Sequence, residues 1–388
     1  MRFLLIGVGA VGTVIATHLV KNPEVSKVVL SDINVDVAEK LAKRLNSEKA
    51  SALRIDAGDR NDLANAMRKI DVVINATLPR YNLLIMDETL KSNAHYLDLA
   101  SDIPPDSVRK QLDLNDAWKD ANLTAIMGLG ADPGMSNLFA RYLADKMDRV
   151  DEIRVRDGDT GITKETAFPC LFSPEVLIDE VLAEPEIYKD GARVKIPPLS
   201  GEETYSFPQP VGPLTVYFVD HEEPETLSRF INKGLRYADF KLALSPEAVQ
   251  IVNVLRWLNL TSKTPIEVKG VKIAPKDLLL SLIPKPADLA GKVEGYSCIT
   301  VEVKGQMGGK RVQAKAYSYM SHQEAYRKYG VTATAYLTGT PPAIGAVMLA
   351  KGDIKVGGVI APECLEPQPL LAEIEKKGIK RNEVINEI

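Results

Sequence analysis

Three glycines after the first apolar run constrain the fold of this chain more than any other feature. Residues 3–6 have the length of a buried parallel strand, and residues 14–20 have helical periodicity. Between them, Gly7, Gly9 and Gly12 follow the pattern G-x-G-x-x-G. In a strand–turn–helix unit the first glycine permits a sharp turn, the second lets backbone amides approach a pyrophosphate, and the third lets the helix pack close to the strand. The segment therefore predicts a dinucleotide-binding loop.

An acidic residue after the second apolar run indicates which dinucleotide binds. Residues 28–30 form that run, and Asp32 follows Gly12 by 20 residues. A carboxylate at this place accepts hydrogen bonds from ribose hydroxyls and repels a 2′-phosphate, so Asp32 predicts NAD, with NADP the less favoured cofactor. The amides of Ala10 and Val11 are expected to face the phosphates, because these residues begin the helix.

Length and composition exclude several classes of function. The 388 residues allow two or three domains, and 45% hydrophobic with 26% charged residues is typical of a soluble globular protein. A net charge of −4 provides no basic field for nucleic acid or an anionic membrane, and no later apolar run reaches the roughly 20 residues of a membrane span. Three widely spaced cysteines predict a reducing, cytoplasmic setting and neither a disulfide framework nor a metal site. A secretory signal peptide is the alternative for the first residues, and the early second strand disfavours it.

Strand-like and helix-like stretches alternate through the first third of the chain. The expected strands after the second one cover residues 52–55, 71–75, 95–99 and 123–127. The expected helices cover residues 35–45, 62–69 (capped by Asp62), 83–93 and 106–121. This alternation predicts an α/β fold with a doubly wound parallel sheet, whose ligands bind beyond the carboxyl ends of the strands.

The remainder of the chain has a different pattern. Runs at 152–156, 214–219, 239–244, 300–304 and 313–319 mostly alternate with period two, which predicts an antiparallel sheet with one covered face in a second, α+β domain. A small, apolar helix at 342–350 is expected to pack back on the first domain, and a last helix at 370–377 is expected to end at Gly378. We therefore predict domains at 1–132 and 133–335 and a returning segment at 336–388.

Five strand-end motifs resemble those of the saccharopine dehydrogenase-like family. Residues 129–137 (LGADPGMSN) contain a G-x-D-P-G signature, residues 75–79 (NATLP) resemble the family's loop near the nicotinamide, and residues 96–100 (YLDLA) resemble its Y-x-D strand. Residues 221–229 and 357–363 are also similar to the family. The resemblance implies a Rossmann domain, an inserted α/β substrate domain that makes homodimer contacts, and a C-terminal return to the Rossmann domain.

The family includes saccharopine reductases, carboxynorspermidine dehydrogenases and lysine 6-dehydrogenases. The resemblance therefore implies an NAD-dependent oxidoreductase that forms or oxidises a C–N bond of an amino acid or amine, such as a saccharopine- or lysine-like substrate. The sequence Ser31-Asp32-Ile33 differs from the arginine-type residue that suits saccharopine reductases to NADP, and it resembles lysine 6-dehydrogenases. The D-P-G triplet resembles the reductases instead, so the substrate stays open.

Oxidation of an amine to an imine requires a hydride acceptor and a group that takes a proton. Asp98 and Asp132 follow two strands on the same rim of the predicted sheet, so either could hold an ammonium group or act as the base. Alternatively, Asp98 caps a turn and Asp132 fixes the Pro-Gly turn. Tyr81 is the third catalytic candidate, although it could equally cap a loop. His221, before an acidic cluster, could serve as an acid or base near neutral pH or could be structural.

The candidate site residues divide by expected ligand. The residues expected to bind the cofactor are Gly7, Gly9, Ala10, Val11, Gly12, Asp32, Ile33, Asp56, Ala76, Thr77, Leu78 and Pro79. The residues expected to bind the substrate are Asp132, Pro133, Gly134, Met135, Asn137, His221 and Arg229, with Arg80 and Arg141 as alternative carboxylate ligands. A dinucleotide sensor without catalysis and a dehydrogenase of a carbonyl or hydroxy substrate are the alternative functions.

Overall fold

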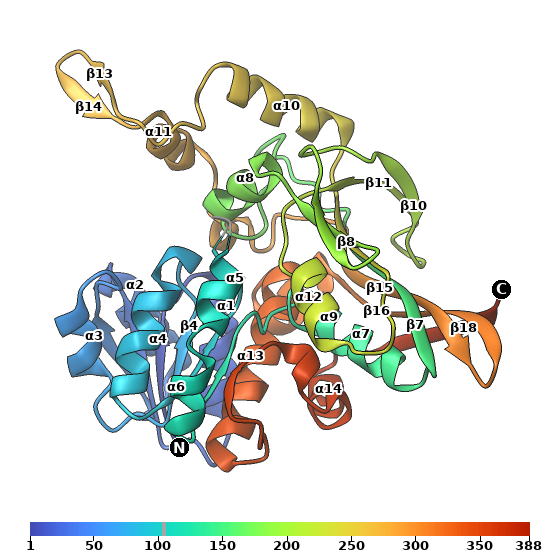
Figure 1. Cartoon of the computed structure of the whole chain (residues 1–388). Coiled ribbons are helices and arrows are strands. Elements are labelled where there is room, and N and C mark those ends of the chain that lie inside the picture. Colours follow the sequence, from blue (N-terminus) through green and yellow to red (C-terminus); the bar gives the residue numbers. More distant parts are fainter. Residues whose placement is uncertain (103–105) are drawn as a thin grey trace.

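Two β-sheets organise the chain, which a computed structural model describes over residues 1–102 and 106–388 (Figure 1). The first sheet has seven parallel strands in the order β17-β6-β5-β4-β1-β2-β3. Its strands are β1 Arg2–Ile6, β2 Lys27–Asp32, β3 Ala50–Arg54, β4 Val72–Asn75, β5 His95–Asp98, β6 Thr124–Ile126 and β17 Gly358–Ile360. The predicted doubly wound parallel sheet is confirmed.

Helices cover both faces of this sheet. They are α1 Ala10–Lys21, α2 Val35–Leu45, α3 Arg60–Ala66, α4 Asn82–Lys91, α5 Ser107–Leu112 and α6 Asn115–Asp120, with a 3₁₀ turn η1 at Pro79–Tyr81. Along β1, Phe3 and Leu5 enter one hydrophobic cluster, whereas Leu4 and Ile6 enter another. Two-sided burial explains why β1 is apolar at successive positions.

Two local predictions in this region are wrong. Asp59, not Asp62, caps α3, because its Oδ1 accepts from the amides of Asn61 and Asp62 while Asp62 accepts from the amide of Asp56 at 3.0 Å. The helix expected at 106–121 is divided into α5 and α6. Each segment buries a large side chain, Gln111 in α5 and Trp118 in α6.

The second sheet has nine strands and is mixed. Its main path is β10-β11-β12-β7-β15-β16-β18; β8 also pairs with β12, and β9 pairs with β8. The strands are β7 Arg149–Asp159, β8 Glu186–Lys189, β9 Ala192–Lys195, β10 Glu203–Ser206, β11 Pro213–Phe218, β12 Tyr237–Ala243, β15 Tyr296–Met307, β16 Lys310–Ser321 and β18 Asn382–Glu387. The prediction of an antiparallel sheet is wrong at its centre, where β12 pairs with β7 in parallel. The long connection between these strands, which contains helices, permits this direction.

The other elements lie around the second sheet, project from it or, as α13 does, pack on the first domain. They are α7 Met135–Asp145, α8 Pro174–Leu182, α9 Glu223–Phe230, α10 Pro246–Trp257, β13 Ile266–Val268, β14 Val271–Ile273, α11 Pro275–Leu282, η2 Pro286–Leu289, α12 His322–Tyr329, α13 Ala333–Lys351, η3 Pro362–Cys364 and α14 Pro367–Lys376. Helices α10 and α11 and the β13–β14 ribbon form an arm, residues 246–282, that projects at the top of Figure 1. No helix of the described ranges has the length and apolar character that a membrane crossing needs.

The C-terminal segment contributes to both sheets. Helix α13 begins at Ala333, earlier than predicted, and packs on α1, where a Cβ on Gly339 would lie 2.7 Å from Val14. Strand β17 extends the first sheet beside β6, as a return to the first domain requires. Strand β18, however, pairs with β16 in the second sheet, so the return is only part of this segment's path. The domain limits stay a prediction.

Candidate active site

The glycine loop has the close contacts that the sequence pattern predicts. Gly7 has a φ of +92°, and a Cβ there would meet the backbone oxygen of Ala76 at 2.5 Å. A Cβ on Gly12 would lie 2.1 Å from the oxygen of Gly7, so the helix and the turn approach each other without room for a side chain. A Cβ on Gly9 would meet nothing within 4 Å. The loop is therefore closed toward the protein and open at Gly9, which fits a pyrophosphate over the N-terminus of α1.

The other predicted cofactor residues lie at the carboxyl ends of β2, β3 and β4. Asp32 ends β2, and its carboxylate accepts from the amides of Val8 at 3.3 Å and Asn34 at 3.0 Å. Ile33 is 62% exposed beside it. Asp56 accepts from the amide of Gly58 at 2.9 Å. These positions fit the ribose and adenine side of a dinucleotide, because Asp32 keeps acceptor capacity on both oxygens.

The loop after β4 continues this rim. The amide of Ala76 donates to the oxygen of Ile6 at 2.8 Å, and the Thr77 hydroxyl donates to Asn75 Oδ1 at 2.6 Å. Leu78 and Pro79, which follow, line a cavity of about 470 Å³. The predicted nicotinamide loop is thus placed next to the cavity.

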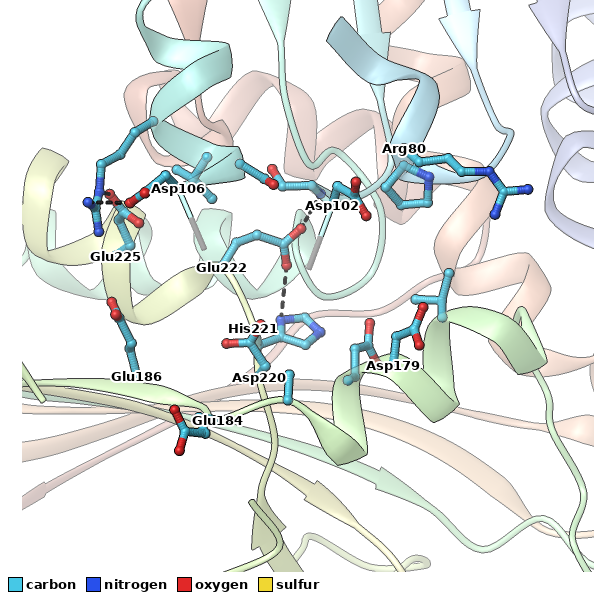
Figure 2. Close-up of a pocket in the computed structure, with 18 of the residues that line it drawn as sticks. Arg80, Asp102, Asp106, Asp179, Glu184, Glu186, Asp220, His221, Glu222 and Glu225 are labelled. Carbon is cyan, nitrogen blue, oxygen red and sulfur yellow. Dashed lines mark hydrogen bonds and ion pairs between the residues drawn. The ribbon is translucent and has the colours of Figure 1, made fainter. Parts of the chain in front are cut away.

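The cavity lies between the first sheet's loops and elements of the second domain (Figure 2). Carboxylates dominate its described lining: Asp102, Asp106, Glu175, Asp179, Glu180, Glu184, Glu186, Asp220, Glu222 and Glu225. Four basic side chains also line it: Arg80, Arg109, Lys195 and Lys263. Of the residues that the sequence nominated for the substrate, His221 and the alternative Arg80 line the cavity.

His221 is held firmly at the cavity wall. Its side chain is 7% exposed, and its ring stacks on Phe240 with 3.7 Å between centroids. Its Nδ1 pairs with Glu223 Oε2 and lies 3.4 Å from Glu222 Oε2. Burial opposes the charged ring, but the carboxylates of Glu223, Glu222 and Glu180 outweigh burial and raise the pKa of His221 well above its usual range. One ring nitrogen of His221 and one oxygen each of Glu222 and Glu223 lie within 4.8 Å of one another. An imidazolium paired with two carboxylates accounts for this cluster, and we assign no metal to it.

Several acids around His221 hold their protons unusually tightly. Burial raises the pKa of Glu180 to about 8, that of Glu222 to about 7 and that of Asp220 to about 6. The positive charge of His221 limits each rise. Some of these carboxyls are therefore neutral near pH 7 until a cation enters the cavity.

Asp98 belongs to a structural network instead of the cavity lining. It is 1% exposed, and its oxygens accept from the amide of Gly128 at 2.7 Å, from Gln111 Nε2 at 2.7 Å and from the Tyr96 hydroxyl at 3.0 Å. Burial raises its pKa to about 7. These contacts tie the ends of β5 and β6 to α5, which favours the turn-fixing interpretation.

Asp132 is close enough to His221 for their charges to interact. It is partly buried, and its Oδ2 is enclosed without a hydrogen-bond partner in the described part of the chain. Burial raises its pKa to about 6, with His221 acting in the opposite direction. Burial, with the nearby carboxylate of Asp132, also holds the pKa of Asp157 well above its ordinary value. Asp132 therefore contributes to the charge around His221 from outside the cavity lining.

The third catalytic candidate, Tyr81, is not among the residues that line the cavity. Its ring would be 3.6 Å from a Cβ on Gly58, and the Arg80 guanidinium lies 5.1 Å from the ring centroid. Tyr81 also packs against the hydrophobic cluster on that side of the first sheet. This placement favours the loop-capping interpretation.

The predicted turn before α7 shapes the site without lining the cavity. Pro133, Gly134 and Met135 are buried, and Asn137 Nδ2 donates to Thr226 Oγ1 at 3.2 Å and to Glu363 Oε2 at 3.0 Å. These contacts join α7, α9 and η3.

Each of the three candidate arginines forms an ion pair with a carboxylate of the protein. Arg229 pairs with Glu225 at 3.2 Å on the outer side of α9. Arg141 pairs with Asp145 at 2.7 Å, outside the cavity lining. Arg80 lines the cavity but pairs with Glu175 at 2.7 Å.

Sequence reasoning missed the residues that define the charge of the cavity. Glu180 comes from α8, Glu222 precedes α9, and Ser136 supports Glu223 from α7. The acidic run after His221 was the available signal for Glu222 and Glu223. Glu180 had no such signal, because its approach to His221 depends on how α8 packs.

Comparison with known proteins covers nearly the whole chain. The family model described as saccharopine dehydrogenase NADP binding domain matches residues 3–126, and that described as saccharopine dehydrogenase C-terminal domain matches residues 130–379. Carboxyaminopropylagmatine dehydrogenase from Synechocystis is 30% identical over 392 residues, covering 99% of this chain and 98% of the relative. Carboxynorspermidine synthase from Vibrio cholerae is 27% identical over 403 residues, covering 98% of this chain and 96% of the relative.

A solved structure has the same fold. Apo saccharopine dehydrogenase (L-Glu forming) from Saccharomyces cerevisiae superposes with a TM-score of 0.74 at 17% identity, covering 99% of each chain. At this identity the likeness concerns the fold alone.

Proposed function

The chain belongs to the saccharopine dehydrogenase family, and from this membership and the charge of its cavity we propose what it takes as substrate. It is an NAD(P)-dependent dehydrogenase that acts on CH–NH donors. We propose that the substrate is a cationic amine with at least two amino groups, one of them in the C–N bond that is formed or oxidised. Saccharopine and lysine are the alternatives to test beside it.

The excess of carboxylates in the cavity carries this proposal. Each lining lysine or arginine already pairs with a lining carboxylate; these pairs are Arg80 with Glu175, Arg109 with Glu225, Lys195 with Glu184 and Lys263 with Asp179. Glu180, Asp220 and Glu222 form no ion pair with a lysine or arginine of the described ranges. A second amino group of the substrate would supply that missing positive charge. The relatives named for carboxyaminopropylagmatine and carboxynorspermidine support an amine that also bears a carboxyl group.

The cofactor proposed is NAD, held by the glycine loop, the amides that begin α1, Asp32 and the loop at Ala76 to Pro79. When bound, the nicotinamide accepts a hydride from, or donates one to, the carbon of the C–N bond. The carboxylate of Asp32 supports NAD, whereas the description of the matching family model names NADP. Separate titrations with NADH and NADPH decide between them.

A substrate panel tests the proposed function. The purified chain is assayed in both directions at 340 nm with diamines, triamines, their carboxylated derivatives, lysine and saccharopine, each with either cofactor. We expect the highest kcat/KM for substrates with two or more cationic groups, and a loss of at least tenfold when one amino group is replaced by methyl. Turnover restricted to substrates with a single amino group would contradict the proposal.

We further propose that the chain forms a homodimer through the arm at residues 246–282. The arm exposes large apolar side chains: Trp257 at 74%, Leu258 at 65%, Val271 at 58% and Leu282 at 74%. Large apolar side chains that are exposed together on one projecting segment are typical of an interface. Trp257→Glu with Leu282→Ser should give a monomer in light scattering, whereas Val37→Ser on α2 should leave the mass unchanged. A wild-type monomer at micromolar concentration would contradict the proposal.

A further inference from the structure

We propose that His221, oriented by Glu223 and Ser136, is the proton-transferring residue of this active site. The inference rests on the proposed function, because it assumes that the carbon and nitrogen of the reacting bond enter the cavity that His221 lines. It assigns to His221 the transfer of a proton to the leaving oxygen when the amine and a carbonyl compound condense.

Contacts on one side of the ring leave the other side available. Nδ1 is occupied by Glu223 Oε2, and the other oxygen of Glu223 accepts from the Ser136 hydroxyl at 2.9 Å. Glu223 is fully buried, so its direction is fixed by these two partners. Nε2 has no hydrogen bond from residues 1–102 or 106–388, and Figure 2 shows the ring at the cavity wall. A histidine held at one nitrogen presents the other in a defined direction.

Three separate elements hold this arrangement. Ser136 lies in the first turn of α7, Glu223 begins α9, and Phe240 on β12 stacks on the imidazole with only 7° between the two planes. An ion pair between His221 and Glu223 would not require any particular orientation of the imidazole plane. Here the stacking fixes the plane of the ring while Glu223 fixes its rotation, as a proton-transferring group requires.

The surrounding charge favours the protonated ring at neutral pH. In the described ranges, the titratable groups whose charges act on His221 from its own loop and from the elements packed against it are carboxyls: Glu222, Asp220, Glu223 on α9, Glu180 on α8, Asp132 before α7 and Asp157 on β7. Glu223 is the nearest and raises the pKa of His221 most among them. His221 therefore carries a proton to donate when the substrate arrives.

The proton transfer balances without any further reactant. The amine first adds to the carbonyl carbon and gives a carbinolamine, R–NH–CH(OH)–R′. The Nε2 proton of the imidazolium passes to the hydroxyl oxygen, the C–O bond breaks, and the nitrogen lone pair forms the C=N bond. The products are the iminium R–NH⁺=CH–R′, one water and neutral His221, so charge and atoms are conserved. In the reverse direction neutral His221 takes the proton from the water that adds to the iminium.

Two measurements on the same variants test this assignment. The pKa of His221 is measured by NMR on the protein without cofactor; the chain has only four histidines, and His221→Gln identifies the signal. The pH profile of kcat/KM is measured in the reductive direction. The variants are His221→Gln, Glu223→Gln and Ser136→Ala, with Glu324→Gln, an exposed carboxylate on α12, as the control.

Glu223→Gln gives the decisive result. We expect its NMR pKa for His221 to fall, and the pH above which kcat/KM declines to fall by the same amount, because the imidazolium is the active form. Ser136→Ala should shift both values in the same direction by less. His221→Gln should lower kcat by about 10²–10⁴-fold, with a smaller change in KM, and should abolish this limb of the profile. Glu324→Gln should match the wild type.

The outcomes separate this inference from the proposed function. Suppose that the wild type turns over amines, and that Glu223→Gln shifts the NMR pKa of His221 but not the pH profile of kcat/KM. Another group then transfers the proton, so this inference is overturned while the proposed function stands. If His221→Gln does not fold, the comparison of Glu223→Gln with the wild type still decides. If the wild type turns over no amine on the panel, the proposed function and this inference fail together.

Discussion

A Cβ on Gly134 would lie 2.2 Å from the backbone oxygen of Gly130 and 2.3 Å from its nitrogen. Gly134 also has a φ of +130°, which side chains rarely permit. This contact sets where α7 begins and therefore where Ser136 meets Glu223. The D-P-G turn that resembles the family's signature therefore supports the site indirectly. It ends one residue before α7, the helix that carries Ser136 to Glu223.

Gly134→Ala should destabilise the fold and disturb the site together. Steric conflict with Gly130 and the unfavourable φ predict a loss of about 2–4 kcal/mol in the free energy of unfolding. Urea denaturation measures it. Gly357→Ala is the matched control, because the nearest atom to its Cβ would be 3.8 Å away. Equal stability of the two variants would contradict this role of Gly134.

The glycine loop predicts different results for two similar substitutions. Gly12→Ala should lower the melting temperature, because its Cβ would meet Gly7 at 2.1 Å. Gly9→Ala should keep the melting temperature, since its Cβ enters open space, yet it should weaken NADH binding by crowding the pyrophosphate. Thermal melts and NADH fluorescence titrations measure the two effects. Unchanged NADH affinity in Gly9→Ala would contradict the placement of the pyrophosphate.

Asp32 should control the choice of dinucleotide. Its carboxylate at the end of β2 repels a 2′-phosphate, so the wild type should bind NADH more tightly than NADPH. Asp32→Ala should reduce this preference by about tenfold, which corresponds to about 1.4 kcal/mol. Asp36→Ala, which removes an exposed carboxylate from α2, is the control. A wild type that prefers NADPH would contradict the proposal.

Glu180 should make stability fall as pH rises. A carboxyl whose pKa rises on folding, here from 4.5 to about 8, stabilises the fold fully below pH 4.5 and loses that contribution as the pH rises through 8. Glu180→Gln should therefore raise stability at pH 8.5 by about 2–4 kcal/mol relative to the wild type, and change it little at pH 5. Melts across pH 5–8.5 measure this difference. Spermidine, a triamine, should stabilise the wild type more than Glu180→Gln at pH 8.5.

Local spacing was enough to predict the first sheet and its glycine loop. The segment from Gly7 to Asp32 forms its turn, helix and strand from residues close together in sequence, so its structure could be predicted from the residues alone. The N-terminal cap of α3 was not predictable in this way, because Asp59 and Asp62 are both suitable residue types. The hydrogen bond from the Asp56 amide to the Asp62 carboxylate is what leaves the capping role to Asp59. Period-two alternation reports which face of a strand is buried but not its direction, and so the parallel pairing of β7 with β12 was missed.

The candidate site was predictable only where a strand end determines it. Leu78 and Pro79 line the cavity because the loop after β4 must lie on the rim of the sheet. Asp98 is equally close to that rim, but Gly128 and Gln111 use its oxygens. The approach of Glu180 to His221 joins residues about 40 positions apart, and no local pattern encodes it.

The first sheet takes its last strand, β17, from a segment more than 200 residues beyond its partner β6. The chain between them builds most of the second sheet and also supplies α13, which packs on α1 of the first domain. An evolutionary exchange of the second sheet, with β18 included, would leave the hydrogen bonds within the first sheet in place. Relatives with new substrates would then arise by exchange of that sheet, and chimaeras that keep α13 with the first sheet and β18 with the second offer a route to the same result in the laboratory.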